Sequence, residues 1–141
     1  MFFEQRTTVP DVPETLSEEY SDSFASWIES IGMDTITDET TLSRSQLERV
    51  HQGSMSTLTL EDAAQIASLV SETPDAETIE MMACEHLLLG MSSAVMDVEM
   101  LAAELEIDLE PKEIQQKIER REPMTIEEYS YIQHAIVDAV S

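Results

Sequence analysis

Apolar residues recur every three or four positions along most of this chain, the spacing that places them on one face of an α-helix. The first such stripe ends at Gly32 and comprises Leu16, Tyr20, Phe24, Trp27, Ile28 and Ile31. The last one comprises Ile126, Tyr129, Ile132, Ile136, Val137 and Val140. No segment alternates between apolar and polar residues with the period of two that a half-buried strand requires. The pattern therefore predicts an all-α protein.

The most apolar segment, Ala76–Val95, is expected to form the central helix and to be buried on more than one side. Its predicted core positions are Ile79, Met82, Leu87, Leu88, Met91 and Val95. Shorter helices are expected at Met33–Thr40 and Val98–Leu105.

Helix-start signals indicate where several of these helices begin. A Ser or Thr followed three residues later by Glu or Gln forms a capping box, in which each side chain binds a free amide of the other residue. This pattern occurs at Thr15–Glu18, Ser43–Gln46 and Thr125–Glu128. Thr59 is expected to cap another helix, and Pro111 fits the first turn of one.

The two halves of the chain repeat this pattern. With a shift of 67 residues, Phe24 corresponds to Met91, Ile28 to Val95 and Leu47 to Ile114. One residue is missing from the following loop, and with a shift of 66 residues Thr59 then corresponds to Thr125. Unrelated amphipathic helices also align tolerably, but here the caps agree as well as the apolar positions. We therefore interpret the chain as an internal duplication.

This interpretation divides the chain into three parts. Residues 1–14 hold two of the five prolines and no periodicity, so a flexible N-terminal arm is expected, although Phe2 and Phe3 are able to dock on the core. Residues 15–73 and 74–141 would form two modules packed as one compact helical domain. The Ala76–Val95 helix would be the seam between them.

The charge is strongly unbalanced, with 30 acidic and 7 basic residues and a net charge of −23. Such an excess fits a surface that stays solvated at very high salt, a ligand for a basic partner or a DNA mimic, or a disordered acidic tail. The acidic residues are spread between apolar positions and do not form one block. This distribution favours the first interpretation, a halophilic protein.

The segment Leu42–Val50 (LSRSQLERV), Gly53 and the segment Leu58–Ala63 (LTLEDA) together resemble helices three and four of the lambda-repressor-like helix-turn-helix family. The resemblance implies recognition helices at Ser43–Gln52 and, in the second copy, at Glu110–Arg121. Thr40 departs from the pattern, because that family usually has a smaller residue before the turn. The chain is also similar to a family of small, acidic, uncharacterised haloarchaeal proteins, most clearly at MACEHLLLGMSSAV.

The scarce basic residues concentrate on these two segments. Six of the seven lie there, namely Arg44, Arg49, Lys112, Lys117, Arg120 and Arg121, and only Arg6 lies elsewhere. The accompanying glutamines are Gln46, Gln52, Gln115 and Gln116. Arginine binds guanine and glutamine binds adenine through paired hydrogen bonds, so these ten residues are the candidate DNA contacts. The alternatives are a protein-facing surface and plain solvated helices with internal pairs such as Glu113 with Lys117.

Catalytic chemistry is not indicated. The chain has no glycine-rich phosphate loop and no nucleophile motif. Cys84, Glu85 and His86 are adjacent, so on a helix they point about 100° apart and cannot close on one metal ion. A packed thiol and a half-buried imidazole are expected instead, with no metal and no cofactor.

The favoured interpretation is a DNA-binding transcriptional regulator of a halophilic archaeon with tandem helix-turn-helix modules. The alternative is a protein–protein interaction module that keeps this fold without DNA contacts. The expected partners are double-stranded DNA, a second copy of the chain or another protein. The N-terminus lacks a signal-peptide pattern, and the apolar region Met81–Met96 is interrupted by polar residues, so we expect a cytoplasmic protein without membrane contact.

Overall fold

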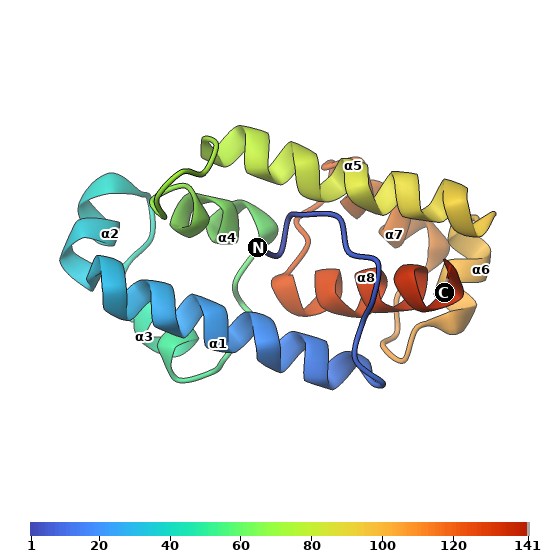
Figure 1. Cartoon of the computed structure of the whole chain (residues 1–141), viewed down its shortest axis with the longest axis horizontal. Coiled ribbons are helices and arrows are strands. Elements are labelled where there is room, and N and C mark those ends of the chain that lie inside the picture. Colours follow the sequence, from blue (N-terminus) through green and yellow to red (C-terminus); the bar gives the residue numbers. More distant parts are fainter. Residues whose placement is uncertain (141) are drawn as a thin grey trace.

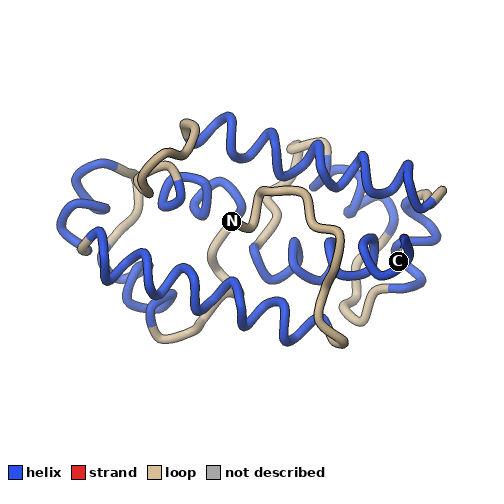
Figure 2. The backbone as a smooth tube through the Cα atoms, viewed as in Figure 1, coloured by secondary structure: helices blue, strands red, loops and turns tan. Residues whose placement is uncertain are grey.

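The computed structural model describes residues 1–140, which form eight α-helices and no β-strand (Figures 1 and 2). The predicted all-α class is therefore confirmed. In chain order the helices are α1 (Pro13–Ile31), α2 (Met33–Glu39), α3 (Arg44–His51), α4 (Leu60–Ala67), α5 (Ala76–Ala94), α6 (Val98–Glu104), α7 (Pro111–Ile118) and α8 (Ile126–Val140).

Most of the predicted helix starts are confirmed by hydrogen bonds. The Gln46 amide donates to the Ser43 hydroxyl at 3.2 Å, and the Ser43 amide donates to the Gln46 side chain at 2.9 Å. Thr59 caps α4 in the same way, with Asp62 as its partner. The start predicted at Thr15 is wrong, because α1 begins at Pro13. A proline in the first turn already has a helical φ and needs no capping hydroxyl.

One core runs through both halves of the chain. The first long helix, α1, packs on α8, and the second, α5, packs on α4 as well as on α8. The long helix of each half thus contacts the last helix of the other half, as Figure 1 shows. The fully buried side chains come from both halves and include Leu16, Phe24, Ile28, Leu47, Ile66, Ile79, Leu87, Leu101, Ile114 and Tyr129. The two halves therefore bury their apolar faces together.

The seam helix α5 has only one buried face. Ile79 and Leu87 lie in the core as predicted, but Leu88 is 49% exposed and Val95 is 82% exposed, so both of these assignments are wrong. The helix lies along one edge of the molecule (Figure 1), and α4, α7 and α8 cover its inner side. Val95 ends α5 in a left-handed conformation, with φ of 53°, beyond the packed part of the helix.

The N-terminal segment is not the flexible arm that its composition predicted. Phe2 and Phe3 are 1% and 4% exposed and pack in the core. Three side chains bind the backbone of the segment: the Tyr129 hydroxyl donates to the Phe2 carbonyl, the His86 Nδ1 to the Phe3 carbonyl and the His134 Nε2 to the Pro10 carbonyl. Burial of two aromatic rings, with these bonds, outweighs the entropy lost by ordering the segment.

The predicted alignment of the two long helices needs a correction. Both α1 and α5 have 19 residues, and their first residues, Pro13 and Ala76, are 63 positions apart, not 67. At this spacing, the buried Ile28 corresponds to the buried Met91 and no longer to the exposed Val95. A shift by four residues keeps nearly the same helix face, which is why the apolar pattern alone gave the wrong register. The duplication itself stays a prediction.

Candidate nucleic-acid interface

The two predicted recognition helices exist, but both are shorter than predicted. The first, α3, spans Arg44–His51 and not Ser43–Gln52, and the second, α7, spans Pro111–Ile118 and not Glu110–Arg121. Each is anchored by two buried apolar residues, which are Leu47 and Val50 in α3 and Ile114 and Ile118 in α7. The outer sides of both helices are consequently left to polar residues.

Both helices end in the same geometry. Gly53, after α3, has a φ of 96°, and Arg120, after α7, has a φ of 63°. In the turn that follows, the Ser54 amide donates to the Arg49 carbonyl at 2.9 Å, and the Arg121 amide donates to the Gln116 carbonyl at 2.8 Å. Arg121 lies 67 positions after Ser54, and Gln116 lies 67 positions after Arg49. This is the shift that the sequence predicted for this region. The loops that follow then meet in an isolated antiparallel bridge.

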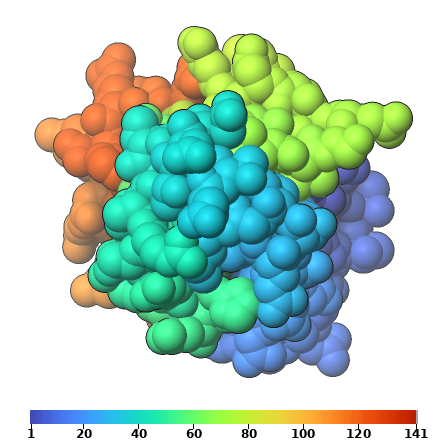
Figure 3. Space-filling model, turned by 90° about the vertical axis from the view of Figure 1, so that its left-hand side faces the viewer, coloured from blue at the N-terminus to red at the C-terminus, as the bar shows by residue number. Residues whose placement is uncertain are grey.

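The two helices lie on the same side of the molecule. Figure 3 shows the residues of α3 (blue-green) and the end of α7 (orange) toward the left, and the first residues of the chain (dark blue) toward the right. The candidate interface is therefore the side opposite the N-terminal segment. It consists of α3, α7 and the two loops that meet between them.

The candidate contacts on α3 are exposed but engaged in local interactions. The Arg44 side chain is 58% exposed, and its guanidinium lies 2.8 Å from an Asp34 carboxylate oxygen and 3.8 Å from one of Glu48. Arg49 donates to the Ser45 hydroxyl at 3.4 Å. Ion pairs this exposed contribute little to stability, so these guanidinium groups are able to exchange partners.

The two glutamines of α3 differ in their roles. The Gln46 side chain accepts the Ser43 amide in the capping box and is thus committed to the helix start. Gln52 is the exposed residue that ends the helix. Of these two glutamines, Gln52 is thus the one whose amide oxygen has no hydrogen bond to another part of residues 1–140.

The two lysines of α7 are in contrasting environments. Lys112 is exposed, and no ion pair involves it within residues 1–140. The Lys117 side chain is only 15% exposed, and its ammonium donates to Glu128 at 3.0 Å and to the Pro123 carbonyl at 2.9 Å. The Glu113–Lys117 pair of the alternative interpretation is replaced by a pair with Glu128, whose carboxylate also accepts the Thr125 amide. Lys117 thus links α7 to the start of α8.

The other polar residues near the end of α7 have acidic neighbours. Arg121 lies 3.6 Å from a Glu119 carboxylate, and Gln115 donates to the same residue at 3.3 Å. Gln116 is half-buried. Arg120 lies after the helix end and is exposed.

A cavity of about 430 Å³ lies between the end of α7 and the start of α4. Its charged lining residues are Lys117, Arg120, Arg121, Glu61, Asp62, Glu80 and Glu122. Burial, and then the neighbouring Glu61 carboxylate, raise the pKa of Glu80. Four carboxylates face three cations in this lining, so the cavity itself has no excess of positive charge.

Cys84 and His86 are placed as predicted. The thiol is buried, and burial raises its pKa to about 11, so it is a packed core group. The imidazole is half-buried. Within residues 1–140 no group of three or more His, Cys, Asp or Glu side chains is arranged to hold a metal ion.

One polar feature was missed by the sequence interpretation. The Tyr20 hydroxyl donates to the Gln133 side-chain oxygen, and the Gln133 amide donates to the Tyr129 hydroxyl at 3.3 Å. Gln133 is 3% exposed, so this chain of hydrogen bonds joins α1 to α8 inside the core. In the sequence, this buried polar group could have been found from Gln133, a glutamine that follows Ile132 on the apolar side of the last helix.

The fold and this surface define an all-α protein with two short basic helices on one side. A family model for a family of unknown function, DUF5791, matches residues 16–139, and the chain belongs to that family. No curated protein and no solved structure matches the chain. The likeness to lambda-repressor-like proteins therefore stays a prediction.

No single helix within residues 1–140 is both long and apolar enough to cross a membrane. By length and composition α5 and α6 would qualify only as a pair, and the chain bends by 92° between them.

Proposed function

We propose that this protein is a transcriptional regulator that binds double-stranded DNA through α3 and α7. The observation that carries the proposal is the placement of the cations. Six of the seven basic residues lie on or directly after two helices, and these helices lie on the same side of the molecule (Figure 3).

The arrangement of the two helices supports reading of two half-sites. Helix-turn-helix dimers present two recognition helices related by a twofold axis. Here α3 and α7 end in matching turns, and the loops after them meet at the Thr59–Thr125 bridge. A single chain would then do what a dimer does in the lambda-repressor-like family that the sequence resembles.

The contacts differ in their expected roles. Arg44, Arg49, Lys112 and Arg121 are exposed and available for phosphates or for guanine edges. Gln52, Gln115 and Arg120 extend the same surface. Lys117, Gln46 and the half-buried Gln116 act mainly by fixing the helices, since two of these side chains are already bonded within the fold.

The charge of −23 places conditions on this function. In dilute buffer such a protein is repelled by DNA. Molar salt shortens the Debye length to about 3 Å, which screens this repulsion but also removes most of the gain from counterion release. We therefore propose binding in the cytoplasm of a halophilic archaeon, where hydrogen bonds to base edges supply most of the affinity.

The test is selection of duplexes from a random pool in multi-molar potassium chloride, followed by fluorescence anisotropy with the selected and a scrambled duplex. Lys112→Ala should weaken binding of the selected duplex by about tenfold, the loss of one charge-assisted hydrogen bond. The matched control is Arg6→Gln, which removes a cation outside the interface and should bind as the unchanged protein does. Failure to enrich any sequence, or equal losses in both variants, would overturn the proposal.

A second candidate is a protein–protein interaction module, which the outer face of α5 favours. Met81, Leu88 and Leu89 are 40%, 49% and 54% exposed on this helix. Apolar side chains grouped in this way often mark contact surfaces. A partner retained in a pull-down after nuclease treatment, and lost with Leu88→Glu, would support this function instead of DNA binding.

A further inference from the structure

A small cavity lies beneath the N-terminal segment, between the C-terminal halves of α5 and α8. Its volume is about 140 Å³. One wall is apolar and is formed by Leu87, Ile136, Val137 and Val140. The other end is polar and includes Arg6, His86 and Gln133.

The charge of this lining contrasts with the rest of the protein. No Asp or Glu lines the cavity, although the chain has 30 acidic residues. Each of four other cavities in the described part of the chain is lined by at least two carboxylates. The cavity also contains Arg6, the one basic residue that lies outside the two candidate recognition segments. Its lining is thus suited to an anion.

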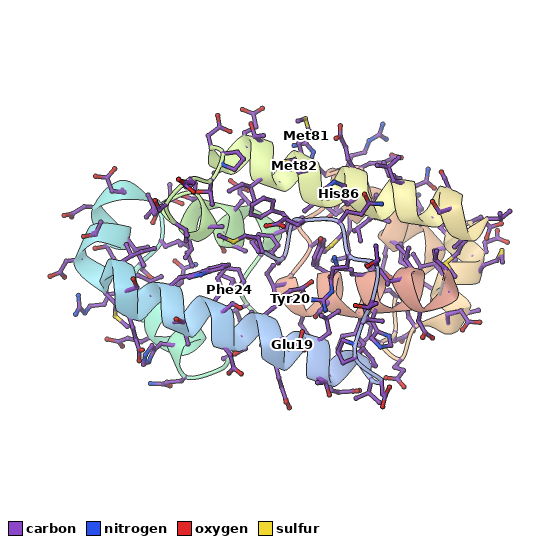
Figure 4. All side chains as sticks on the ribbon, viewed as in Figure 1. Glu19, Tyr20, Phe24, Met81, Met82 and His86 are labelled. Atoms are coloured by element: carbon purple, nitrogen blue, oxygen red, sulfur yellow. The ribbon has the colours of Figure 1, made fainter. Side chains whose placement is uncertain are left out.

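The His86 ring is already oriented for this role. Its Nδ1 lies 2.7 Å from the Phe3 carbonyl, which can only accept, so Nδ1 carries the hydrogen. The Nε2 atom is then left for a ligand, and in the imidazolium form of the ring it carries a hydrogen that can be donated to a carboxylate. Figure 4 shows His86 on the side of α5 toward the N-terminal segment, whereas Met81 points away from it.

Arg6 is held beside the cavity without losing all its hydrogen-bond donors. Its Nε donates to the Thr8 carbonyl at 3.0 Å, and its guanidinium lies 5.9 Å from the centre of the Tyr20 ring. One Nη is 3.6 Å from a Glu19 carboxylate oxygen, a distance too long for a strong hydrogen bond. The guanidinium has five N–H donors, so some remain for a ligand carboxylate.

The apolar wall is built by close helix packing. A Cβ added to Gly90 would lie 2.6 Å from the Ile136 side chain, so α5 and α8 approach closely there. Cavities of about 150 Å³ lined by apolar side chains are large enough to hold benzene. The wall therefore fits one aromatic ring or a short branched alkyl chain.

We propose that this cavity binds a small monocarboxylate with an aromatic or branched apolar tail. The tail lies against Val137 and Ile136, and the carboxylate meets Arg6 and His86. This site is separate from α3 and α7, and its test requires no DNA.

The test is a titration with benzoate, followed by amide chemical shifts in a ¹⁵N-labelled sample of the full chain. Benzyl alcohol and benzylamine serve as uncharged and cationic probes of nearly the same shape. Benzoate should shift the amides of Arg6, His86, Ser93 and Val137 in a saturable manner. Neither control probe should do so at the same concentration.

Two variants separate the polar end from the apolar end. Arg6→Gln should weaken benzoate binding about tenfold, as expected for loss of one charged hydrogen bond, whereas Arg49→Gln should leave it unchanged. Val137→Phe fills the apolar end while keeping Arg6 and His86, and should abolish binding. The amide spectrum of each variant reports whether that variant is folded. If Arg6→Gln does not fold, the result for Val137→Phe tests the proposal by itself. Equal binding of benzyl alcohol, unchanged binding in Val137→Phe, or no saturable shifts would overturn the proposal.

Discussion

Thr59 and Thr125 face each other in an antiparallel bridge, and each is the capping residue of the helix that follows it. The Leu60 amide donates to the Met124 carbonyl at 2.6 Å, and the Ile126 amide donates to the Leu58 carbonyl at 2.8 Å. The two bonds correspond, because the donor Ile126 lies 66 positions after the donor Leu60, and the acceptor Met124 lies 66 positions after the acceptor Leu58. The bridge thus fixes the starts of α4 and α8 against each other at the centre of the molecule.

The first prediction concerns these two caps. Thr59→Ala and Thr125→Ala should each lower the free energy of unfolding by about 1 kcal/mol, because an amide in the first helical turn loses its partner. The measurement is denaturant unfolding at fixed salt, with Thr57→Ala, an exposed loop threonine, as the control.

The same experiment tests whether the two halves unfold together. Trp27 fluorescence reports on α1, and far-ultraviolet circular dichroism reports on all helices. Because α1 packs on α8 and α4 packs on α5, the two signals should change in one shared transition. Separate midpoints would show that each half is an independent unit.

The second prediction concerns Gly90, where two effects oppose each other. Within a helix, alanine is favoured over glycine by about 1 kcal/mol. A Cβ at this position would meet the Ile136 side chain at 2.6 Å, and overpacking of this kind costs about 1–3 kcal/mol. Gly90→Ala should therefore destabilise the protein, as thermal unfolding would show.

The control and the rescue use the same helices. Ser92→Ala, at an exposed position of α5, should leave the midpoint nearly unchanged. Ile136→Ala removes the clashing atom, so the double variant should lose less stability than the two single losses combined. A stabilising Gly90→Ala would mean that α5 and α8 are not in close contact there.

Features that depend on neighbouring residues were predictable from the sequence. The boxes at Ser43–Gln46 and Thr125–Glu128 form within four residues, so their patterns identified two true helix starts. The burial of Leu47 and Ile114 followed from helical spacing in the same way.

Features that depend on distant residues were not predictable. Docking of Phe2 and Phe3 requires Tyr129 and His86, which no local pattern connects to the N-terminus. The exposure of Leu88 depends on which side of α5 the other helices cover. In the candidate interface, the sequence located the cations but not the partner of Lys117, because Glu128 lies on another helix.

The third prediction compares the two lysines of α7, the bonded Lys117 and the exposed Lys112. Lys117→Ala removes an ammonium that holds Glu128 and the Pro123 carbonyl, and should lower the free energy of unfolding by about 1–2 kcal/mol. Lys112→Ala changes an exposed side chain, and its effect should stay within about 0.5 kcal/mol. Equal effects in guanidinium titrations would show that Lys117 is not a structural residue.

The fourth prediction concerns the Cys84 thiol, which is buried in the core and whose pKa burial raises to about 11. Because the thiolate is the reactive form, a disulfide reagent at mildly alkaline pH should modify the native protein very slowly. Denaturant should restore rapid reaction. A Ser92→Cys variant, made in a Cys84→Ala background, supplies an exposed thiol on the same helix and should react at once. Rapid modification of native Cys84 would contradict its buried position.

The fifth prediction is the direction in which alkaline pH changes stability. The unfolded thiol loses its proton near its ordinary pKa of 9.0, whereas the folded thiol keeps its proton until its pKa of about 11. Between these pH values the unfolded state binds fewer protons, so the free energy of unfolding should fall as pH rises. Burial also raises the pKa of Tyr129, which contributes in the same direction. Cys84→Ala should therefore show a smaller loss of stability between pH 9 and 11 than the unchanged protein, and an identical loss would show that this thiol does not couple to folding.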